Sequence, residues 1–278
     1  MSFSILNNIA SLEAQNQLST TQSNLQKTLF QLSSGSRINS GADDAAGLAI
    51  ANGLQANITA LNQSANNAND GVGALQVADG ALSQVTTLLN RAVTLATEAS
   101  TGTVSSSQRT ALDAEFTQIK AEIDRIGSTT TFNGTSVFSA TTTSIFLSDA
   151  SSNSTIGVSV GALASSNITD GASTANLSGD DLTTDTNAQT ALTDIDTAIA
   201  NVAGIRGNIG ATINRLQSAA NVISTQVQNL TSAEDTITAA NIPQQVTNLS
   251  QYSILNQTGI SALAQANSQE QSVLKLLQ

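Results

Sequence analysis

Two adjacent carboxylates, Asp43 and Asp44, come nearest to a catalytic pair in this sequence. Paired carboxylates can act as general acid and general base, but they need a further polar group and a pocket. The chain has no histidine, which removes the usual general base and the commonest metal ligand. The pair lies in a turn before an expected helix, where negative charge stabilises the first helical turn. We therefore expect these carboxylates to support a helix start rather than catalysis.

The remaining composition also argues against a reactive site. The chain has no cysteine, so it offers no thiolate nucleophile, no disulfide and no zinc site of the usual kind. Gly71, Gly73 and Gly80 lack the Lys-Ser/Thr that follows the glycines of a nucleotide-binding loop. The sequence therefore predicts a protein that is not an enzyme and has no catalytic residues, no cofactor and no metal.

Charge and hydropathy limit the partners and the compartment. The net charge is −11 with nine basic residues, which repels phosphate backbones and predicts no nucleic-acid partner. No stretch approaches 18 continuous apolar residues, so we expect no membrane-spanning helix. Met1–Ala10 lacks the basic and apolar regions of a secretory signal. This leaves a cytoplasmic protein, or export by a route without a cleaved signal peptide.

Two long heptad patterns, one in each half of the chain, indicate the elements that must position everything else. Apolar residues recur at alternating steps of four and three, which keeps one stripe of a helix toward a partner. The second pattern corresponds to a helix of about 68 Å. We expect the two helices to pack along an intramolecular seam. The seam residues are Leu54, Leu61, Leu75, Leu82, Leu89, Ile199, Ile209, Leu216, Ile223 and Leu230.

Charged residues interrupt both patterns. Asp79, Arg206 and Glu234 occupy positions that are otherwise mostly apolar. Buried charges cost stability unless they are paired, and a polar seam residue can fix helix register. The alternative is that these side chains lie at the seam edge in water. The pattern leaves both interpretations open.

The fold class is predicted as mainly α, with a long antiparallel coiled-coil-like helical rod and a small β-hairpin region in the middle of the chain. Strict alternation of Ile156, Val158 and Val160 and the Asn133-Gly134 turn signal favour the hairpins. The expected elements are helices over 3–33, 47–99, 107–126, 186–238 and 245–277, a β-hairpin region over 130–165 and a polar linker over 165–185. The expected domain segments are 1–46, 47–185, 186–240 and 241–278.

The terminal helices are amphipathic and cannot bury their apolar faces alone. They need each other or other subunits, so their apolar residues are the candidates for a subunit interface. These residues are Ile5, Ile9, Leu12, Leu25, Leu29, Leu255, Ile260, Leu263, Val273 and Leu274.

Several motifs in a fixed order resemble one family. The N-terminal match centres on Leu32–Ala51 (LSSGSRINSGADDAAGLAIA) and continues through Asn66–Gly73 and Glu122–Gly134. The C-terminal match covers Ile205–Leu216 (IRGNIGATINRL) and Gly259–Leu277. On these motifs the chain resembles bacterial flagellin, in a short form that lacks large outer domains.

The resemblance implies a structural subunit that polymerises into the bacterial flagellar filament for swimming motility. It implies terminal helices that form an inner tube and long helices that form the surrounding rod domain. The implied partners are further copies of the chain in a helical homopolymer, a flagellar export chaperone, and the filament cap and hook-junction proteins. The implied location is extracellular. The alternative is a hook–filament junction protein, which shares the terminal motifs; the matches over Arg91–Gly134 and the C-terminus favour flagellin.

The resemblance also suggests a surface for innate immune recognition. Arg91, Leu95 and Glu115 match the positions through which the vertebrate Toll-like flagellin receptor recognises the family. The family's Arg-Glu-Leu run is altered here to Val93-Thr94-Leu95, which predicts weaker receptor binding. The alternative role for these residues is subunit packing in the filament.

Overall fold

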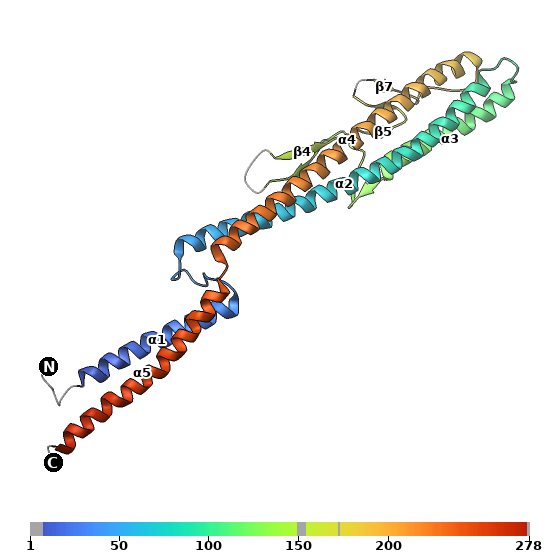
Figure 1. Ribbon diagram of the computed structural model, residues 1–278. Coiled ribbons are helices and arrows are strands. Elements are labelled where there is room, and N and C mark those ends of the chain that lie inside the picture. The colour runs from blue at the N-terminus through green and yellow to red at the C-terminus, as the bar shows by residue number, and fades with distance from the viewer. Residues whose placement is uncertain (1–7, 149–153, 172, 277–278) are drawn as a thin grey trace. The chain divides into compact units, whose positions relative to one another are not determined.

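The computed structural model describes residues 8–148, 154–171 and 173–276, and over them the chain is mainly helical. The fold-class prediction is confirmed: long helices dominate, and short strands occupy the middle of the chain (Figure 1). The helices are α1 (Ile9–Ser34), α2 (Ala45–Ala99), α3 (Ser106–Thr129), α4 (Asp185–Thr238) and α5 (Ile242–Leu276). The strands are β1 (Thr131–Phe132), β2 (Thr135–Ser136), β3 (Thr143–Phe146), β4 (Thr155–Val158), β5 (Leu163–Ala164), β6 (Asn167–Thr169) and β7 (Thr174–Ala175).

The described residues group into two compact units. The first contains the chain up to Ala56 together with the chain from Asn229 onward. The second contains Asn57–Gln228. The divisions therefore fall inside α2 and α4, whereas the sequence placed domain boundaries near the helix ends. Because both helices continue without a break, no turn or proline marks these divisions in the sequence.

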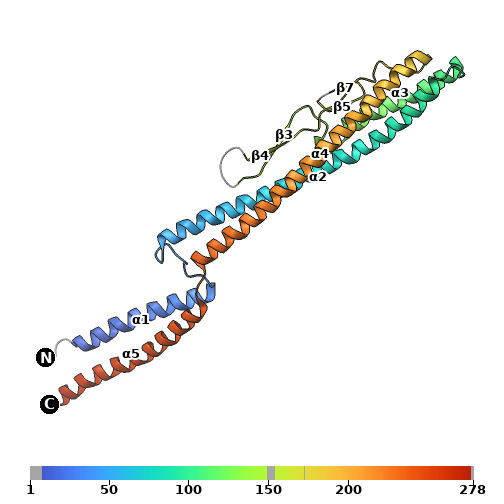
Figure 2. The same cartoon turned by 45° about the horizontal axis from the view of Figure 1, so that its top comes forward.

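In the first unit, α1 and α5 lie side by side (Figures 1 and 2). The side chains that α1 buries are polar: Thr21, Thr28 and Gln31. Each threonine hydroxyl donates to a carbonyl one turn earlier in its own helix, at 2.8 Å in both cases. An added Cβ at Gly259 would lie 3.2 Å from Leu18 Cδ1, so the helices approach closely there. The side chains that α1 buries are therefore polar, and Leu18 packs against Gly259 of α5.

In the second unit, α2 and α4 run antiparallel. Asp79 contacts Arg206, and the position of Gly71 contacts Leu216, so residue numbers fall along α4 as they rise along α2. On each helix every seventh residue is fully or almost fully buried, and the alternate heptad positions are half-buried. The buried set on α2 is Leu61, Ala68, Leu75, Leu82, Leu89 and Ala96. The buried set on α4 is Ile195, Val202, Ile209, Leu216 and Ile223.

Helix α2 buries a second stripe that the single-seam interpretation did not include. Its residues also recur every seven positions, and they are Ala78, Val85, Ala92 and Ala99. Helix α3 lies beside α2 in both views (Figures 1 and 2) and buries Phe116 and Ile123 completely. Since α4 already occupies the first stripe, we infer that the second stripe faces α3. Three helices, rather than two, share the core of this unit.

Side-chain caps fix several helix ends. The Ser105 hydroxyl accepts a hydrogen bond from the backbone amide of Gln108, and the Gln108 side-chain oxygen accepts one from the backbone amide of Ser105. Together they make a capping box at the start of α3. Gly35 ends α1 with φ of 69°, a left-handed conformation that glycine adopts without a side-chain clash.

Short antiparallel strands pair as hairpins. β1 pairs with β2 through Asn133 and Gly134, which have φ of 49° and 77° and make the expected tight turn. β3 pairs with β4, with Ile145 opposite Ile156. The predicted β-hairpin region is therefore present.

The segment over 165–185, predicted to be a polar linker, contains two strands and several buried side chains. β6 pairs with both β5 and β7 in a three-stranded sheet, so Asn167–Thr169 and Thr174–Ala175 are strands. Four apolar side chains of this segment are fully or almost fully buried, although polar neighbours hide them in the sequence. They are Ile168, Ala175, Leu177 and Leu182. Single buried residues between polar ones gave no periodic signal.

Two glycines, one with no room for a Cβ and one facing open space, test this packing. A Cβ added at Gly127 in α3 would overlap the carbonyl oxygen of Leu163 in β5, whereas nothing lies within 4 Å at Gly80 in α2. We expect Gly127→Ala to lower the free energy of unfolding by about 1–3 kcal/mol through overpacking. Gly80→Ala should raise it by up to about 1 kcal/mol, because alanine favours helix. Denaturant unfolding followed by circular dichroism measures both, and equal shifts would contradict the close α3–β5 approach.

Candidate packing and recognition sites

The predicted seam residues fall into two groups. Leu54, Ile199 and Leu230 are half-buried. The other seam residues are buried: Leu61, Leu75, Leu82, Leu89, Ile209, Leu216 and Ile223. Half-burial at Ile199 follows from its alternate heptad position, which lies at the edge of the contact with α2.

The sequence left two interpretations open for Asp79 and Arg206: charges paired within the seam, or charges at its edge in water. The structure shows features of both. Arg206 Nε lies 2.7 Å from Asp79 Oδ1, so the charges are paired. The two side chains are 39% and 40% exposed, so the pair also lies at the seam edge. The hydrogen bond that Arg206 donates to Asp79 raises the pKa of Arg206. A pair this exposed contributes about 0–1 kcal/mol, so we infer that it sets register more than it adds stability.

Glu234 lies near the end of α4 and is half-buried. In the amide orientation that satisfies both groups, Gln55 donates to Glu234 Oε2 at 2.9 Å and to Oε1 at 3.1 Å. This charged seam position is therefore satisfied by a neutral amide from α2.

The seam generates a direct test at Leu216, which is 0% exposed. We expect Leu216→Ala to lower the free energy of unfolding by about 2–5 kcal/mol, from lost burial and the cavity left behind. Ser218 is exposed two residues further on, and Ser218→Ala should change it by less than about 0.5 kcal/mol. Thermal and denaturant unfolding of the monomer give both values. Equal destabilisation by the two changes would refute the heptad assignment.

The suggested receptor residues divide by exposure. Arg91 Nε donates to Glu115 Oε1 at 2.7 Å and Nη2 donates to Oε2 at 3.0 Å, linking α2 to α3 on an exposed surface. The hydrogen bond from Arg91 lowers the pKa of Glu115. Leu95 is 1% exposed, so its assignment as a contact residue does not fit this fold. Leu95 belongs to the helix core, because α2 is covered on more than one side here.

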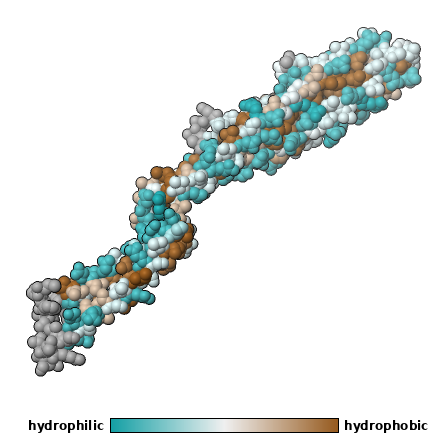
Figure 3. Space-filling view, viewed as in Figure 1, coloured by the Kyte–Doolittle hydropathy of each residue, from teal (hydrophilic) through white to brown (hydrophobic). Residues whose placement is uncertain are grey.

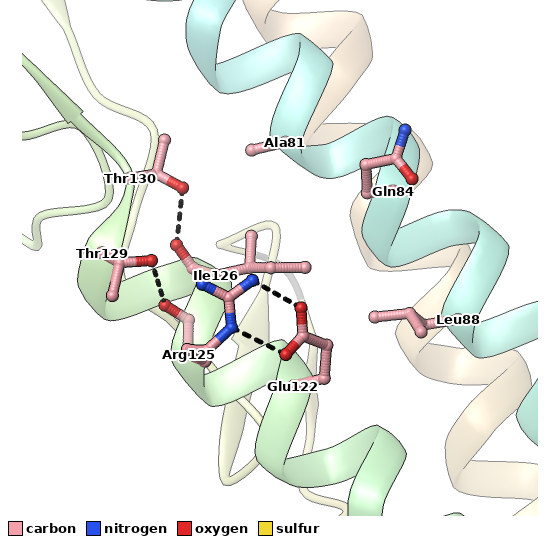
Figure 4. A pocket seen from close by; sticks show the side chains of 8 residues that line it. All are labelled: Ala81, Gln84, Leu88, Glu122, Arg125, Ile126, Thr129 and Thr130. Atoms are coloured by element: carbon pink, nitrogen blue, oxygen red, sulfur yellow. Dashed lines mark hydrogen bonds and ion pairs between the residues drawn. The ribbon is translucent and has the colours of Figure 1, made fainter.

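A groove of about 410 Å³ lies between α2 and α3 (Figure 4). Arg125 and Glu122 form an ion pair at 2.6 Å beside it, and the Thr129 and Thr130 hydroxyls donate to carbonyls of α3 itself. The remaining lining is mainly apolar. Its residues are Ala81, Gln84, Leu88 and Ile126. The charges and hydroxyls drawn here already have partners, so the groove offers a packing surface rather than a reactive site.

A second groove, of about 470 Å³, lies between α2 and the first two hairpins. Its apolar lining includes Phe132, Ile145 and Val158, and Phe146 beside them is 42% exposed. Asp70 is the charged residue in this lining. The mixture of aromatic side chains and threonines contains no nucleophile–base pair.

Asp43 and Asp44 act at the start of α2, as the sequence suggested. Asp44 Oδ1 accepts a hydrogen bond from the Gly47 amide at 2.9 Å, which caps the helix. Asp43 Oδ2 accepts from the amides of Asn39 and Ser40, and its Oδ1 lies 2.7 Å from Lys27 Nζ. The bond with Lys27, followed by the backbone amides, lowers the pKa of Asp43 to about 2. The carboxylate therefore ties the loop before α2 to α1.

The lowered pKa predicts a local acid transition. Because the folded pKa of Asp43, about 2, lies below its ordinary value of 3.8, ionised Asp43 stabilises the loop above pH 3.8. That contribution is lost as the pH falls through about 2. We expect amide-exchange protection at Asn39 and Ser40, corrected for intrinsic rates, to fall across this window. Asp43→Asn should weaken protection at neutral pH and flatten the transition; an unchanged transition would exclude this carboxylate as its cause.

Asp180 behaves in the opposite way. Burial, followed by the nearby charge of Asp194, raises the pKa of Asp180, while Lys120 Nζ donates to its backbone carbonyl at 2.6 Å. The fold therefore disfavours ionised Asp180, so this residue lowers the free energy of unfolding as the pH rises through its folded pKa.

Within the described residues, no three Asp, Glu, His or Cys side chains are grouped to hold a metal ion.

The predicted interface residues of α1 and α5 are mostly exposed. Ile9 is 67% exposed, Leu12 60% and Ile260 52%, and Leu29 and Leu255 are also exposed. Leu25 and Leu263 are half-buried. Ile5 lies outside the described residues, as do the side chains of Val273 and Leu274 at the end of α5.

Further exposed apolar residues on these helices were missed. They are Phe30, Ile242, Val246 and Ile254, with Phe30 at 60% and Ile254 at 63% exposure. Hydrophobic residues are visible on the surface of this helix pair (Figure 3). Phe30 directly follows Leu29, so the apolar surface of α1 is wider than one heptad stripe. No helix among the described residues is long and apolar enough to cross a membrane.

This architecture defines a helical structural protein whose terminal helices leave apolar surface uncovered. Two family models match it: the bacterial flagellin N-terminal helical region over residues 5–143, and the bacterial flagellin C-terminal helical region over residues 192–277. The chain belongs to the bacterial flagellin family.

Curated relatives match along almost the whole chain. Flagellin of Halalkalibacterium halodurans is 35% identical, and the alignment covers 98% of this chain and 99% of that one. Flagellin of Bacillus subtilis and the flagellar filament 30.7 kDa core protein of Treponema maltophilum are each 32% identical at the same coverage. The crystal structure of Bacillus cereus flagellin matches with a TM-score of 0.48 and 32% identity, over 61% of this chain and 94% of that one.

The two family models and the curated relatives establish the function. The protein is a filament subunit of the bacterial flagellum, located in the filament outside the cell, and it self-polymerises. It serves motility as a structural protein and is not an enzyme. The relatives' names favour the filament over the hook–filament junction that the sequence left as an alternative.

Proposed function

We propose that the exposed apolar residues of α1 and α5 are the contacts through which subunits pack in the filament. The observation that carries the proposal is the inverted arrangement of this helix pair. Thr21, Thr28 and Gln31 are buried, while Leu12, Phe30 and Ile254 are each at least 60% exposed. A helix pair that stood alone in water would bury its aliphatic side chains first. The pair is therefore built to be covered by other copies of the chain.

The charges on these helices fit this role. The sequences of α1 and α5 contain four charged residues, Glu13, Lys27, Glu270 and Lys275, and Lys27 is paired with Asp43. A surface with so few charges presents little desolvation cost when another subunit covers it. Surface helices that remain in water usually carry many charged residues on the outer face.

Further partners are proposed for the same termini and for the α2–α3 surface. The export chaperone, the filament cap and the hook-junction proteins are proposed to bind these apolar terminal helices before or at the ends of assembly. A host Toll-like receptor is proposed to contact the exposed Arg91–Glu115 pair, with Leu95 acting only by supporting α2 from the core. Export without a cleaved signal peptide stays a prediction.

Ile254 offers the sharpest test of the subunit contact. Burying an isoleucine in the polymer contributes about 1.5–3 kcal/mol. We expect Ile254→Asp to raise the subunit concentration needed for polymerisation by tenfold or more, since about 1.4 kcal/mol corresponds to tenfold. Sedimentation of filaments over a concentration series measures this effect. The monomer's unfolding midpoint should stay unchanged, because the side chain is 63% exposed.

The neighbouring exposed Ser253 supplies the matched control. Ser253→Asp adds the same charge one residue away without removing an apolar group. Normal polymerisation by Ile254→Asp, or equal losses in the two variants, would reject the proposed apolar contact.

A further inference from the structure

Buried leucines hold the chain on both sides of Asp180. Leu177 and Leu182 are each 0% exposed. The Leu177 amide donates to Ser165 O at 2.8 Å, and the Leu182 amide donates to Asp113 Oδ1, on α3, at 2.8 Å. Because the backbone is anchored at both leucines, the Asp180 side chain cannot leave its surroundings unless this short stretch of chain detaches.

The carboxyl of Asp180 meets a second carboxyl. Its Oδ2 is buried and has no hydrogen-bond partner among the residues that the structure describes. The side chain of Asp194, on α4, lies within hydrogen-bonding reach of Asp180. Two ionised carboxylates offer only acceptors, so they repel each other and cannot form a hydrogen bond. One proton changes this, because it turns one of the two groups into a donor.

The nearest cation does not neutralise this pair. Lys120 Nζ donates to the backbone carbonyl of Asp180 at 2.6 Å and lies 4.8 Å from the centre of the Phe116 ring. Burial and the charge of Asp194 raise the pKa of Asp180 by more than the charge of Lys120 lowers it. The charged groups around Asp180 come from both helices and from its own segment: Lys120 and Asp113 on α3, Asp194 on α4, and Asp181.

Asp181, the next residue in the chain, has the opposite environment. Its Oδ1 accepts a hydrogen bond from the Thr183 amide at 2.9 Å and another from Asn187 Nδ2 at 3.0 Å. The hydrogen bonds from Thr183 and Asn187 lower the pKa of Asp181. Two adjacent aspartates therefore respond to acid in opposite ways, and only Asp180 gains a favourable contact when it takes up a proton.

We propose that Asp180 and Asp194 share one proton, which acts as an acid-strengthened latch between α4 and residues 177–182. With the proton in place, one carboxyl donates to the other and the repulsion disappears. Without it, the leucines and the backbone hydrogen bonds hold the segment against that repulsion. Because the folded pKa of Asp180 is raised, the latch contributes fully below the ordinary value of 3.8 and is lost as the pH rises through the folded pKa. The proposal does not depend on the surfaces through which subunits pack.

A carboxyl titration of the full-length chain tests the shared proton. Aspartates labelled with a carbon isotope at the side-chain carboxyl report their protonation by NMR. We expect one titration step above pH 3.8, seen at both Asp180 and Asp194 because the two groups titrate as a pair. In Asp194→Asn the step at Asp180 should shift down towards 3.8, since the repelling charge is gone. If both carboxyls of the unaltered chain titrate at or below 3.8, the proposal is refuted without any variant.

Hydrogen exchange at the Leu177 amide measures the latch itself, because its acceptor, Ser165 O, does not titrate. Its protection, corrected for intrinsic rates, should fall as the pH rises through the step, by up to about tenfold for each unit that separates the pKa values of the closed and open states. Asp180→Asn carries a permanent donor, so its protection should stay at the acid level at every pH. Asp180→Ala has neither charge nor donor, and its protection should be independent of pH but lower.

Two neighbouring aspartates supply matched controls. Asp196 is exposed on α4, so Asp196→Asn removes the same charge and should leave both readouts unchanged. Asp181→Asn should weaken protection at neutral pH, because it removes an ionised acceptor, while the step of the pair stays above 3.8. An equal fall of protection in the unaltered chain and in Asp180→Asn would overturn the latch. Equal protection in Asp180→Asn and Asp180→Ala would reject the hydrogen bond between the two carboxyls.

Discussion

Burial of the seam stripe that recurs every seven residues on both α2 and α4 is the constraint on which the rest of the structure depends. Residues such as Leu75, Leu82, Ile209 and Leu216 are 0–2% exposed, while the alternate heptad positions stay half-buried. This geometry lets two long helices pack with a thin core of aliphatic residues and alanine. It also explains how a chain with 3% aromatic residues can be well packed over a long distance. Each turn contributes a similar small amount, and no single bulky cluster is needed.

The thin seam determines where polar groups are tolerated. Asp79 and Arg206 can occupy heptad positions because those positions lie at the edge, where both side chains keep about 40% exposure. The desolvation cost that would accompany a fully buried pair is therefore small. On the other side of α2, a stripe of three alanines and Val85 at every seventh position faces α3 with small side chains. Gly127 allows the β5 backbone to lie directly against α3, which anchors the strand region to the helices.

The seam buries its aliphatic side chains, whereas the terminal helices leave many of theirs exposed. α1 lies beside α5 and buries Thr21, Thr28 and Gln31, while both helices leave aliphatic and aromatic side chains in water. Much of their apolar surface is therefore not buried within one chain. In a flagellin subunit this arrangement is physically consistent, since apolar surface left uncovered in the monomer can drive polymerisation. The hydrogen bonds from residues 35–37 to the end of α4 link the helix pair to the remainder of its unit.

The sequence by itself determined the long helices, their heptad seam, the Asn133-Gly134 turn and the family, because these rest on local periodicity and contiguous motifs. It also indicated the apolar terminal helices. Only the tertiary structure decided that α3 covers a second stripe of α2, that Leu95 is buried, and that the supposed linker contributes Ile168 and Leu177 to the core. It alone paired Asp79 with Arg206 and placed Arg37 at the end of α4. The physical reason is that these features depend on contacts between residues distant in sequence, for which no local pattern is required.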